Sequence, residues 1–133
     1  MISDPDIRAK VRSINIDTIT FPFGSAEISD GQLDKLEDLA DAILETLDRN
    51  PHERILIAGH TDAVGSFEAN LELSEERAAA VLEILVEEFD VPAENLESVG
   101  YGEQYLLVET YAAERRNRRV VLRAVGSLLA EAD

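Results

Sequence analysis

The segment from Gly59 to Ser66 places an imidazole, a hydroxyl and a carboxylate side by side, at His60, Thr61 and Asp62. It directly follows the run Arg54 to Ala58, which is too short for a helix and predicts a strand buried on both faces. In open α/β sheets, ligands bind at the carboxyl ends of strands, because the loops there converge above a rigid edge. This location makes Asp62 a candidate ligand-binding residue.

Arg77 lies near the start of a second predicted helix, and two interpretations of it are open. If Ser74 caps that helix, Arg77 occupies its third position, where the partial positive charge of the helix end disfavours a cation. Arg77 and the neighbouring N–H groups would then bind a carboxylate together. If the helix begins near Ser66 or Phe67, Arg77 is an ordinary solvated or salt-bridged side chain. The residues alone favour this second interpretation, because most surface arginine–carboxylate pairs contribute little.

Catalytic chemistry has weaker support. His60, Asp62 and His52 are of the types that hold the metal in a hydrolase, but their spacing is unspecific. A histidine directly after a buried strand is more often a structural residue whose ring is hydrogen-bonded locally. Gly100-Tyr101-Gly102 lacks the third glycine and the following helix of a phosphate-binding loop, and no nucleophile with an adjacent base can be assigned. We therefore expect no enzymatic activity, no metal and no cofactor.

The first half of the chain predicts the elements that position these residues. From Ile14 to Phe21, β-branched and aromatic residues predict a strand, which the following proline and glycine stop. Ser29 and Gln32 then form an S-x-x-Q capping box, which marks a helix start. Asn50-Pro51 ends this helix. Its apolar positions recur at helical spacing: Leu33, Leu36, Ala40, Ile43 and Leu47.

The second half continues the alternation of helices and strands. Leu96 to Tyr101 and Val120 to Val125 are predicted as strands, and a helix ends near Asp90-Val91-Pro92. This alternation indicates α/β layering with at least one crossover between parallel neighbours. The second helix is predicted from apolar residues at three- and four-residue spacing: Ala78, Val81, Leu82, Leu85, Val86 and Phe89.

Composition indicates one globular domain. The chain has 133 residues, of which 45% are hydrophobic and 30% charged, which is enough for one stable core. The formal net charge of -16 argues against a nucleic-acid partner bound through phosphates and against adhesion to anionic lipid. One local cluster is basic, and we expect it to pair with neighbouring carboxylates: Arg115, Arg116, Arg118, Arg119 and Arg123.

The chain contains no cysteine, so a disulfide framework and a thiolate metal site are excluded and the redox compartment stays open. Its N-terminus lacks a basic region followed by an apolar core, and no apolar run reaches the length of a membrane span. These features predict a soluble chain without an encoded membrane anchor.

Several motifs occur in order along the chain: Phe21-Pro22-Phe23-Gly24-Ser25-Ala26; Gly59-His60-Thr61-Asp62 with Gly65-Ser66, Asn70, Leu73-Ser74 and Arg77-Ala78; Gly100-Tyr101-Gly102-Glu103; and Asn117-Arg118-Arg119-Val120. This pattern resembles the OmpA-like peptidoglycan-binding domain, the family of outer-membrane protein A, MotB and the peptidoglycan-associated lipoprotein. The resemblance covers residues 14–125 and leaves residues 1–13 as an N-terminal extension and 126–133 as a tail. It implies an α/β (α+β) two-layer sandwich, in which two long helices pack on a mixed four-stranded sheet in β-α-β-α-β-(short α)-β order.

The resemblance also implies a function: non-catalytic binding of peptidoglycan through the diaminopimelate residue of its stem peptide. By carry-over, Asp62 would bind the ligand's ammonium group and Arg77 its carboxylate. A ligand that is itself an amino acid needs one anion and one cation held close together, which these two residues would supply. The other binding residues that the resemblance indicates are Thr61, Asn70, Gly24, Ser25 and Arg118.

The family resemblance places the domain in the periplasm of a Gram-negative bacterium, as the soluble part of a membrane-anchored envelope protein that could dimerise. An alternative is a structural or protein-interaction module that has kept the fold without wall binding. Two departures from the family pattern stand out: Gly24 occupies a position where many members have Asp or Asn, and Leu106 one where Pro often follows the turn. Three tyrosines could stack on sugar rings, but we expect them to cover the core edge: Tyr101, Tyr105 and Tyr111.

Overall fold

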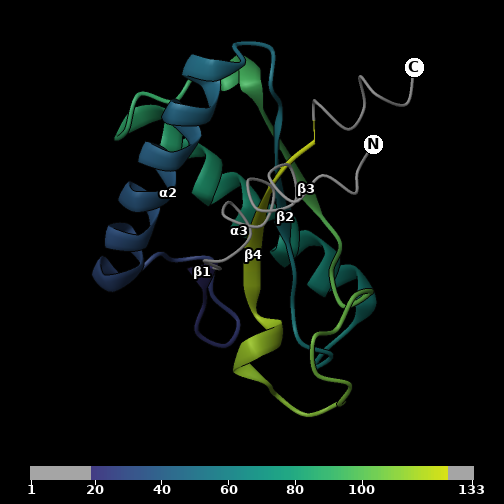
Figure 1. The fold of residues 1–133 in the computed structure, drawn as a ribbon. Coiled ribbons are helices and arrows are strands. Elements are labelled where there is room, and N and C mark those ends of the chain that lie inside the picture. The colour runs from purple at the N-terminus through teal and green to yellow at the C-terminus, as the bar shows by residue number, and fades with distance from the viewer. Residues whose placement is uncertain (1–18, 126–133) are drawn as a thin grey trace, which may run out of the picture.

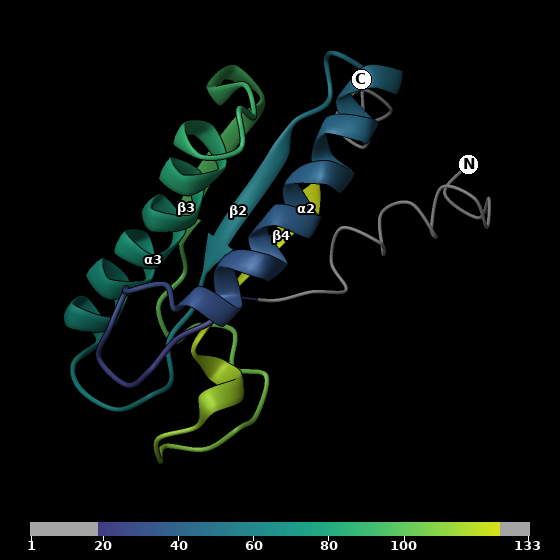
Figure 2. The ribbon, with the colours of Figure 1, turned by 90° about the vertical axis from the view of Figure 1, so that its left-hand side faces the viewer.

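The computed structural model describes residues 19–125, so the predicted extension 1–13, the start of the strand predicted from Ile14 and the tail 126–133 lie outside the described residues. Two long helices cover one face of a four-stranded sheet (Figure 1). In Figure 2 both helices lie in front of the sheet, with strand β4 visible behind α2. The elements are β1 (Ile19–Thr20), α2 (Asp30–Arg49), β2 (Ile55–Gly59), α3 (Phe67–Glu87), a 3₁₀ turn (Ala93–Asn95), β3 (Leu96–Gly100), a second 3₁₀ turn (Arg115–Asn117) and β4 (Arg119–Ala124).

The sheet is mixed, with the strand order β1-β4-β2-β3. Strands β2 and β3 are parallel, and α3 is the crossover that connects them, as the sequence predicted. Strand β4 runs antiparallel to both β2 and β1. The predicted two-layer fold is therefore confirmed, with one difference. The short helix before β4 is a 3₁₀ turn closed by a hydrogen bond from Asn117 N to Glu114 O at 3.1 Å, three residues apart.

The core lies between the helices and one face of the sheet. Successive strand residues point to opposite faces, so Ile55 and Ile57 of β2 face the helices and are fully buried, whereas Leu56 faces the other way and is only half-buried. The prediction that this strand is buried on both faces is therefore wrong at Leu56. The core also includes helix and strand residues at the predicted positions: Leu36, Ile43, Val81, Leu85, Val120 and Leu122.

The start of α2 was predicted correctly, but its capping interaction was not. Ser29 is the N-cap, yet its side chain makes no capping hydrogen bond. Gln32 instead accepts a hydrogen bond at Oε1 from the backbone N–H of Thr20, at 3.0 Å. Thr20 lies in β1 at the edge of the sheet, where a backbone donor needs a partner outside the ladder, and the Gln32 amide supplies it.

Helix α3 begins at Phe67 and not at Ser74. The side chain of Ser66 caps it by accepting a hydrogen bond from Ala69 N at 3.1 Å. The longer helix places Arg77 in its interior, as the second interpretation of the sequence required. No helix among residues 19–125 is long and apolar enough to cross a membrane.

Candidate functional site

Loops from four parts of the chain gather where β2 and β3 end, below the arrowhead of β2 in Figure 2. Backbone hydrogen bonds join them: His60 N donates to Arg119 O at 2.8 Å, and Thr61 N donates to Gly102 O at 2.9 Å. The segment Gly59–Ser66 therefore lies between the end of β3 and the start of β4. The sequence predicted a ligand site at this end of the sheet, at the carboxyl ends of the parallel strands.

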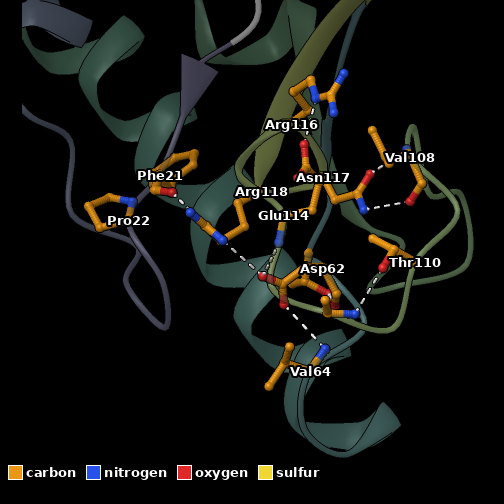
Figure 3. A network of polar contacts seen from close by, with 12 residues as sticks. Phe21, Pro22, Asp62, Val64, Val108, Thr110, Glu114, Arg116, Asn117 and Arg118 are labelled. Atoms are coloured by element: carbon orange, nitrogen blue, oxygen red, sulfur yellow. Dashed lines mark hydrogen bonds and ion pairs between the residues drawn. The ribbon is translucent and has the colours of Figure 1, made fainter.

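Asp62 forms a buried ion pair with Arg118 at this edge (Figure 3). Its Oδ2 accepts a hydrogen bond from Arg118 Nη1 at 3.0 Å, and the two side chains are only 5% and 13% exposed. Oδ1 accepts from Val64 N at 3.3 Å, while Glu114 N lies 3.4 Å from Oδ2. Arg118 also donates from Nε to Phe21 O at 3.0 Å. A carboxylate and a guanidinium are thus held at fixed positions close to the surface.

Arg77 is fully buried, with 0% of its surface exposed. Nε donates to Ser25 O at 2.8 Å, Nη1 to His60 O at 3.0 Å and Nη2 to Pro22 O at 3.2 Å. Its guanidinium lies 5.1 Å from the ring centroid of Phe21, a cation–π contact. The prediction of an ordinary solvated side chain is therefore wrong, because the loop after β1 folds over α3 and supplies carbonyl acceptors.

Burial lowers the pKa of Arg77 to about 10, while the carboxylate of Asp62 opposes this shift. The guanidinium therefore remains protonated at neutral pH. Asp62 and Arg77 share no hydrogen bond, since the carbonyls occupy the fork of Arg77. The site therefore contains one largely buried ion pair, between Asp62 and Arg118, and a second cation, Arg77, that is completely buried.

Two further predicted residues hold the loop that presents Asp62. Thr61 donates from Oγ1 to Asp62 O at 2.9 Å. Asn70, on the first turn of α3, donates from Nδ2 to Asp62 O at 3.3 Å and to Val64 O at 3.1 Å. It also donates to Glu103 Oε1 at 3.1 Å, a partner that sequence reasoning missed although Glu103 belongs to a recognised motif. These contacts fix the position of Asp62.

Gly24 and Ser25 lie in the loop that covers Arg77. Gly24 has a φ of +67°, in a turn closed by Ser25 N donating to Pro22 O at 3.3 Å. Only glycine, asparagine and aspartate adopt this left-handed conformation readily, which accounts physically for the exchange of Asp or Asn for Gly. A Cβ at this position would contact nothing within 4 Å. A side chain here would point into open space beside the site.

Asn117 is a second residue that the sequence analysis did not single out as functional. It is fully buried, accepts a hydrogen bond at Oδ1 from Val108 N at 2.8 Å and donates from Nδ2 to Val108 O at 2.9 Å (Figure 3). This pair of bonds imitates a strand ladder and holds the loop between β3 and β4. The sequence feature that could have identified Asn117 is its place in the closing motif, directly before Arg118.

His60 has no ring hydrogen bond of the kind expected from the sequence. It is 6% exposed, its Nδ1 lacks a partner among the described residues, and its ring lies 5.6 Å from that of Tyr101. Burial, together with the positive charges of Arg119 and Arg123, lowers its pKa from 6.5 to about 4. His60 is therefore neutral at pH 7. No group of three or more metal-ligating side chains able to hold an ion occurs in the described part of the chain.

The depressed pKa of His60 makes stability depend on pH. As the pH falls, the unfolded chain protonates His60 before the folded chain does. The stabilisation that neutral His60 gives to the folded state is therefore complete above pH 6.5 and is lost as the pH falls toward 4. We expect the wild type to lose about 2 kcal/mol more than His60→Gln between about pH 7.5 and about pH 5. Urea unfolding at both pH values measures this difference, and equal losses in the two proteins would contradict it.

The fold and the site define a two-layer α/β domain with a buried aspartate–arginine pair at the end of the sheet where β2 and β3 stop. The model of the OmpA family matches residues 20–119, and the chain belongs to this family. It is 34% identical over 114 residues to outer membrane porin F of Pseudomonas aeruginosa, an alignment that covers 84% of this chain and 31% of the porin.

A second relative is motility protein B of Bacillus subtilis, which is 36% identical over 112 residues, or 78% of this chain and 41% of that protein. Among solved structures, the peptidoglycan-associated lipoprotein of Burkholderia pseudomallei is similar with a TM-score of 0.68 and 28% identity, covering 92% of this chain and 98% of that one. The chain thus spans less than half of these two sequence relatives but nearly all of the lipoprotein structure.

Proposed function

We propose that this domain binds peptidoglycan non-covalently and without catalysis, and thereby anchors an envelope protein to the cell wall. Membership of the OmpA family and the similarity to a lipoprotein described as peptidoglycan-associated support the proposal. The observation that carries it is the buried pair of Asp62 and Arg118, with Arg77 behind, at the loop edge of the sheet. Such paired local charges recognise a zwitterion independently of the overall charge of -16.

The ligand group is the diaminopimelate residue of the stem peptide, in which an ammonium and a carboxylate share one carbon. Asp62 binds the ammonium, and Arg77 binds the carboxylate, with Arg118 beside them. Carbonyls of Pro22 and Ser25 occupy two donors of Arg77 in the free domain, so the loop must withdraw for direct contact. The bonds to these carbonyls already have an ionised donor, so the exchange replaces neutral acceptors by a charged carboxylate that matches the planar fork of the guanidinium.

The remaining predicted residues line or support this contact. Gly24 and Ser25 lie on the loop that moves, and Thr61 and Asn70 hold the backbone of Asp62. We place the domain in the periplasm, as the soluble part of a membrane-tethered envelope protein. The porin and motility relatives, of which it spans 31% and 41%, are consistent with such a parent.

Asp62→Asn is expected to weaken sedimentation with purified sacculi by about 30-fold or more, because it leaves the cation of Arg118 without its carboxylate and removes the ammonium partner. Free diaminopimelate is expected to compete with the wild type. Circular dichroism verifies that the variant is folded.

Glu97→Gln is the matched control. Glu97 forms an exposed ion pair with Arg54 on the sheet, so the variant removes the same charge without touching the site. It is expected to bind sacculi like the wild type. The proposal is wrong if the wild type stays in the supernatant, or if Asp62→Asn sediments as well as Glu97→Gln.

A further inference from the structure

Two adjoining hollows lie beside the candidate site and include neither Asp62 nor Arg77. The first, of about 780 Å³, is formed mainly by residues 103–111. The second, of about 560 Å³, lies on the face of the sheet opposite the helices, where Leu56 and Ala58 of β2 point. Tyr105, Leu107 and Arg119 line both hollows. Both volumes are in the range of roughly 300–1,000 Å³ that small-ligand sites occupy.

Aromatic rings form the wall of these hollows. Tyr105 is 60% exposed and Tyr111 is 90% exposed, so the expectation that they cover the core edge is wrong for both. The ring of Tyr105 meets that of Tyr101 edge-on, with centroids 5.2 Å apart and planes at 89°, and Tyr101 in turn contacts His60. Leu107, which lines both hollows, is 63% exposed and adds an aliphatic side chain to this surface. Exposed apolar and aromatic side chains gathered around one depression mark an interaction site.

The polar groups of the hollows suit an uncharged ligand that has many hydroxyl groups. The first hollow offers oxygen acceptors and amide or hydroxyl groups at Glu103, Gln104, Glu109 and Thr110. His60, Arg119 and Arg123 line the second hollow; the Nδ1 of His60 has no partner among the described residues and is itself buried. A polyanion would be repelled by the net charge of -16 and by Glu103 and Glu109, the carboxylates of the first hollow. A sugar ring has a C–H face that stacks on tyrosine and a rim of hydroxyls that bind carboxylates and amides.

The loop that lines the first hollow is fixed to the candidate site at both ends. At its start, Glu103 accepts a hydrogen bond from Asn70. At its end, Glu114 N lies within hydrogen-bond distance of Asp62. A long molecule that is bound at Asp62 can therefore reach the tyrosines of residues 103–111 without crossing another element.

We propose that the hollows around Tyr105 and Tyr111 are a second subsite, which binds the N-acetylated amino-sugar chain of the cell wall by stacking on these tyrosines. The proposal rests on the proposed function, because the sugar chain is the covalent continuation of the stem peptide bound at Asp62. The peptide site supplies charge recognition, and the tyrosine subsite supplies neutral contact area along the glycan.

The test uses three probes: intact sacculi, free diaminopimelate, and the tetramer of N-acetylglucosamine as a glycan without peptide. Tyr105→Ala is expected to bind sacculi roughly three- to tenfold more weakly, the value of an aromatic contact, while its affinity for diaminopimelate is unchanged. Tyr105→Phe keeps the ring and is expected to retain most of the affinity. Phe67→Ala, which removes an exposed aromatic residue that lines neither hollow, is expected to bind like the wild type.

In NMR titrations, the tetramer is expected to shift the backbone resonances of residues 103–111 in the wild type and not in Tyr105→Ala. The proposal is overturned if the tetramer shifts none of these resonances, or if Tyr105→Ala binds sacculi like Phe67→Ala. A change of oligomeric state in Tyr105→Ala without a tetramer shift would assign the surface to a second copy of the chain. If the wild type does not bind free diaminopimelate, the result refutes the proposed function instead.

Discussion

Arg77→Ala is expected to lower the free energy of unfolding by about 4 kcal/mol, because it removes the donor to three carbonyls and leaves a cavity under the loop after β1. The side chain is fully buried and contacts the ring of Phe21, so its removal leaves three carbonyl acceptors and one aromatic face without their partner. For a domain of this size the loss corresponds to a fall in Tm on the order of 15 °C. Thermal and urea unfolding measure both quantities.

A second variant separates packing from hydrogen bonding. Arg77→Met fills most of the volume but donates no hydrogen bond, so we expect a loss of about 2–3 kcal/mol, between those of Arg77→Ala and the wild type. If Arg77→Ala unfolds within about 1 kcal/mol of the wild type, the three hydrogen bonds do not hold the loop. Binding to these variants is therefore measured at temperatures well below their Tm, so that a loss of ligand contact is distinguished from unfolding.

Gly59→Ala is expected to destabilise the domain by about 3 kcal/mol or more, through overpacking of β2 against α3. A Cβ at Gly59 would overlap the backbone carbonyl oxygen of Ser74, and backbone atoms cannot move aside as a flexible side chain does. Gly100, the β3 partner of Gly59, faces the same helix turn, and a Cβ there would lie 2.5 Å from Ser74 Oγ and Glu75 N. The close approach of helix and sheet therefore depends on both glycines.

Gly31→Ala is the control for this prediction. Gly31 lies in the first turn of α2, and a Cβ there would meet nothing within 4 Å. Because alanine is a better helix former than glycine, we expect this variant to be neutral or more stable by about 0.5–1 kcal/mol. Urea unfolding of the two variants at one pH gives the comparison. Similar midpoints for Gly59→Ala and Gly31→Ala would contradict the steric explanation.

The main elements of the fold could be predicted from local patterns. The apolar periodicity of Leu36, Ile43 and Leu47 predicted α2, and the break at Asn50-Pro51 predicted its end, because these signals act within one element. The start of α3 was ambiguous between Ser66 and Ser74, since both serines are good caps; the structure uses Ser66 and buries the hydroxyl of Ser74 against β3. Local propensity could not decide this point, because it depends on where the sheet lies.

The candidate site shows the same division. Asp62 could be identified from its place after a buried strand, and the ordered motifs identified Arg77, Asn70 and Arg118. The state of Arg77 could not be predicted, because its acceptors at Pro22 and Ser25 are more than 50 residues away in the chain. The pairing of Asp62 with Arg118 spans 56 residues in the same way.

The sequence by itself determined the alternation of strands and helices, the order of the motifs and the types of charged groups available for binding. These properties follow from periodicity and residue chemistry, which are local. Only the tertiary structure decided which carboxylate meets which guanidinium, that Arg77 is covered by backbone carbonyls, and that Tyr105 and Tyr111 are exposed beside the site. Burial and hydrogen bonding between distant segments exist only after the sheet has brought those segments together, so no local pattern can encode them individually.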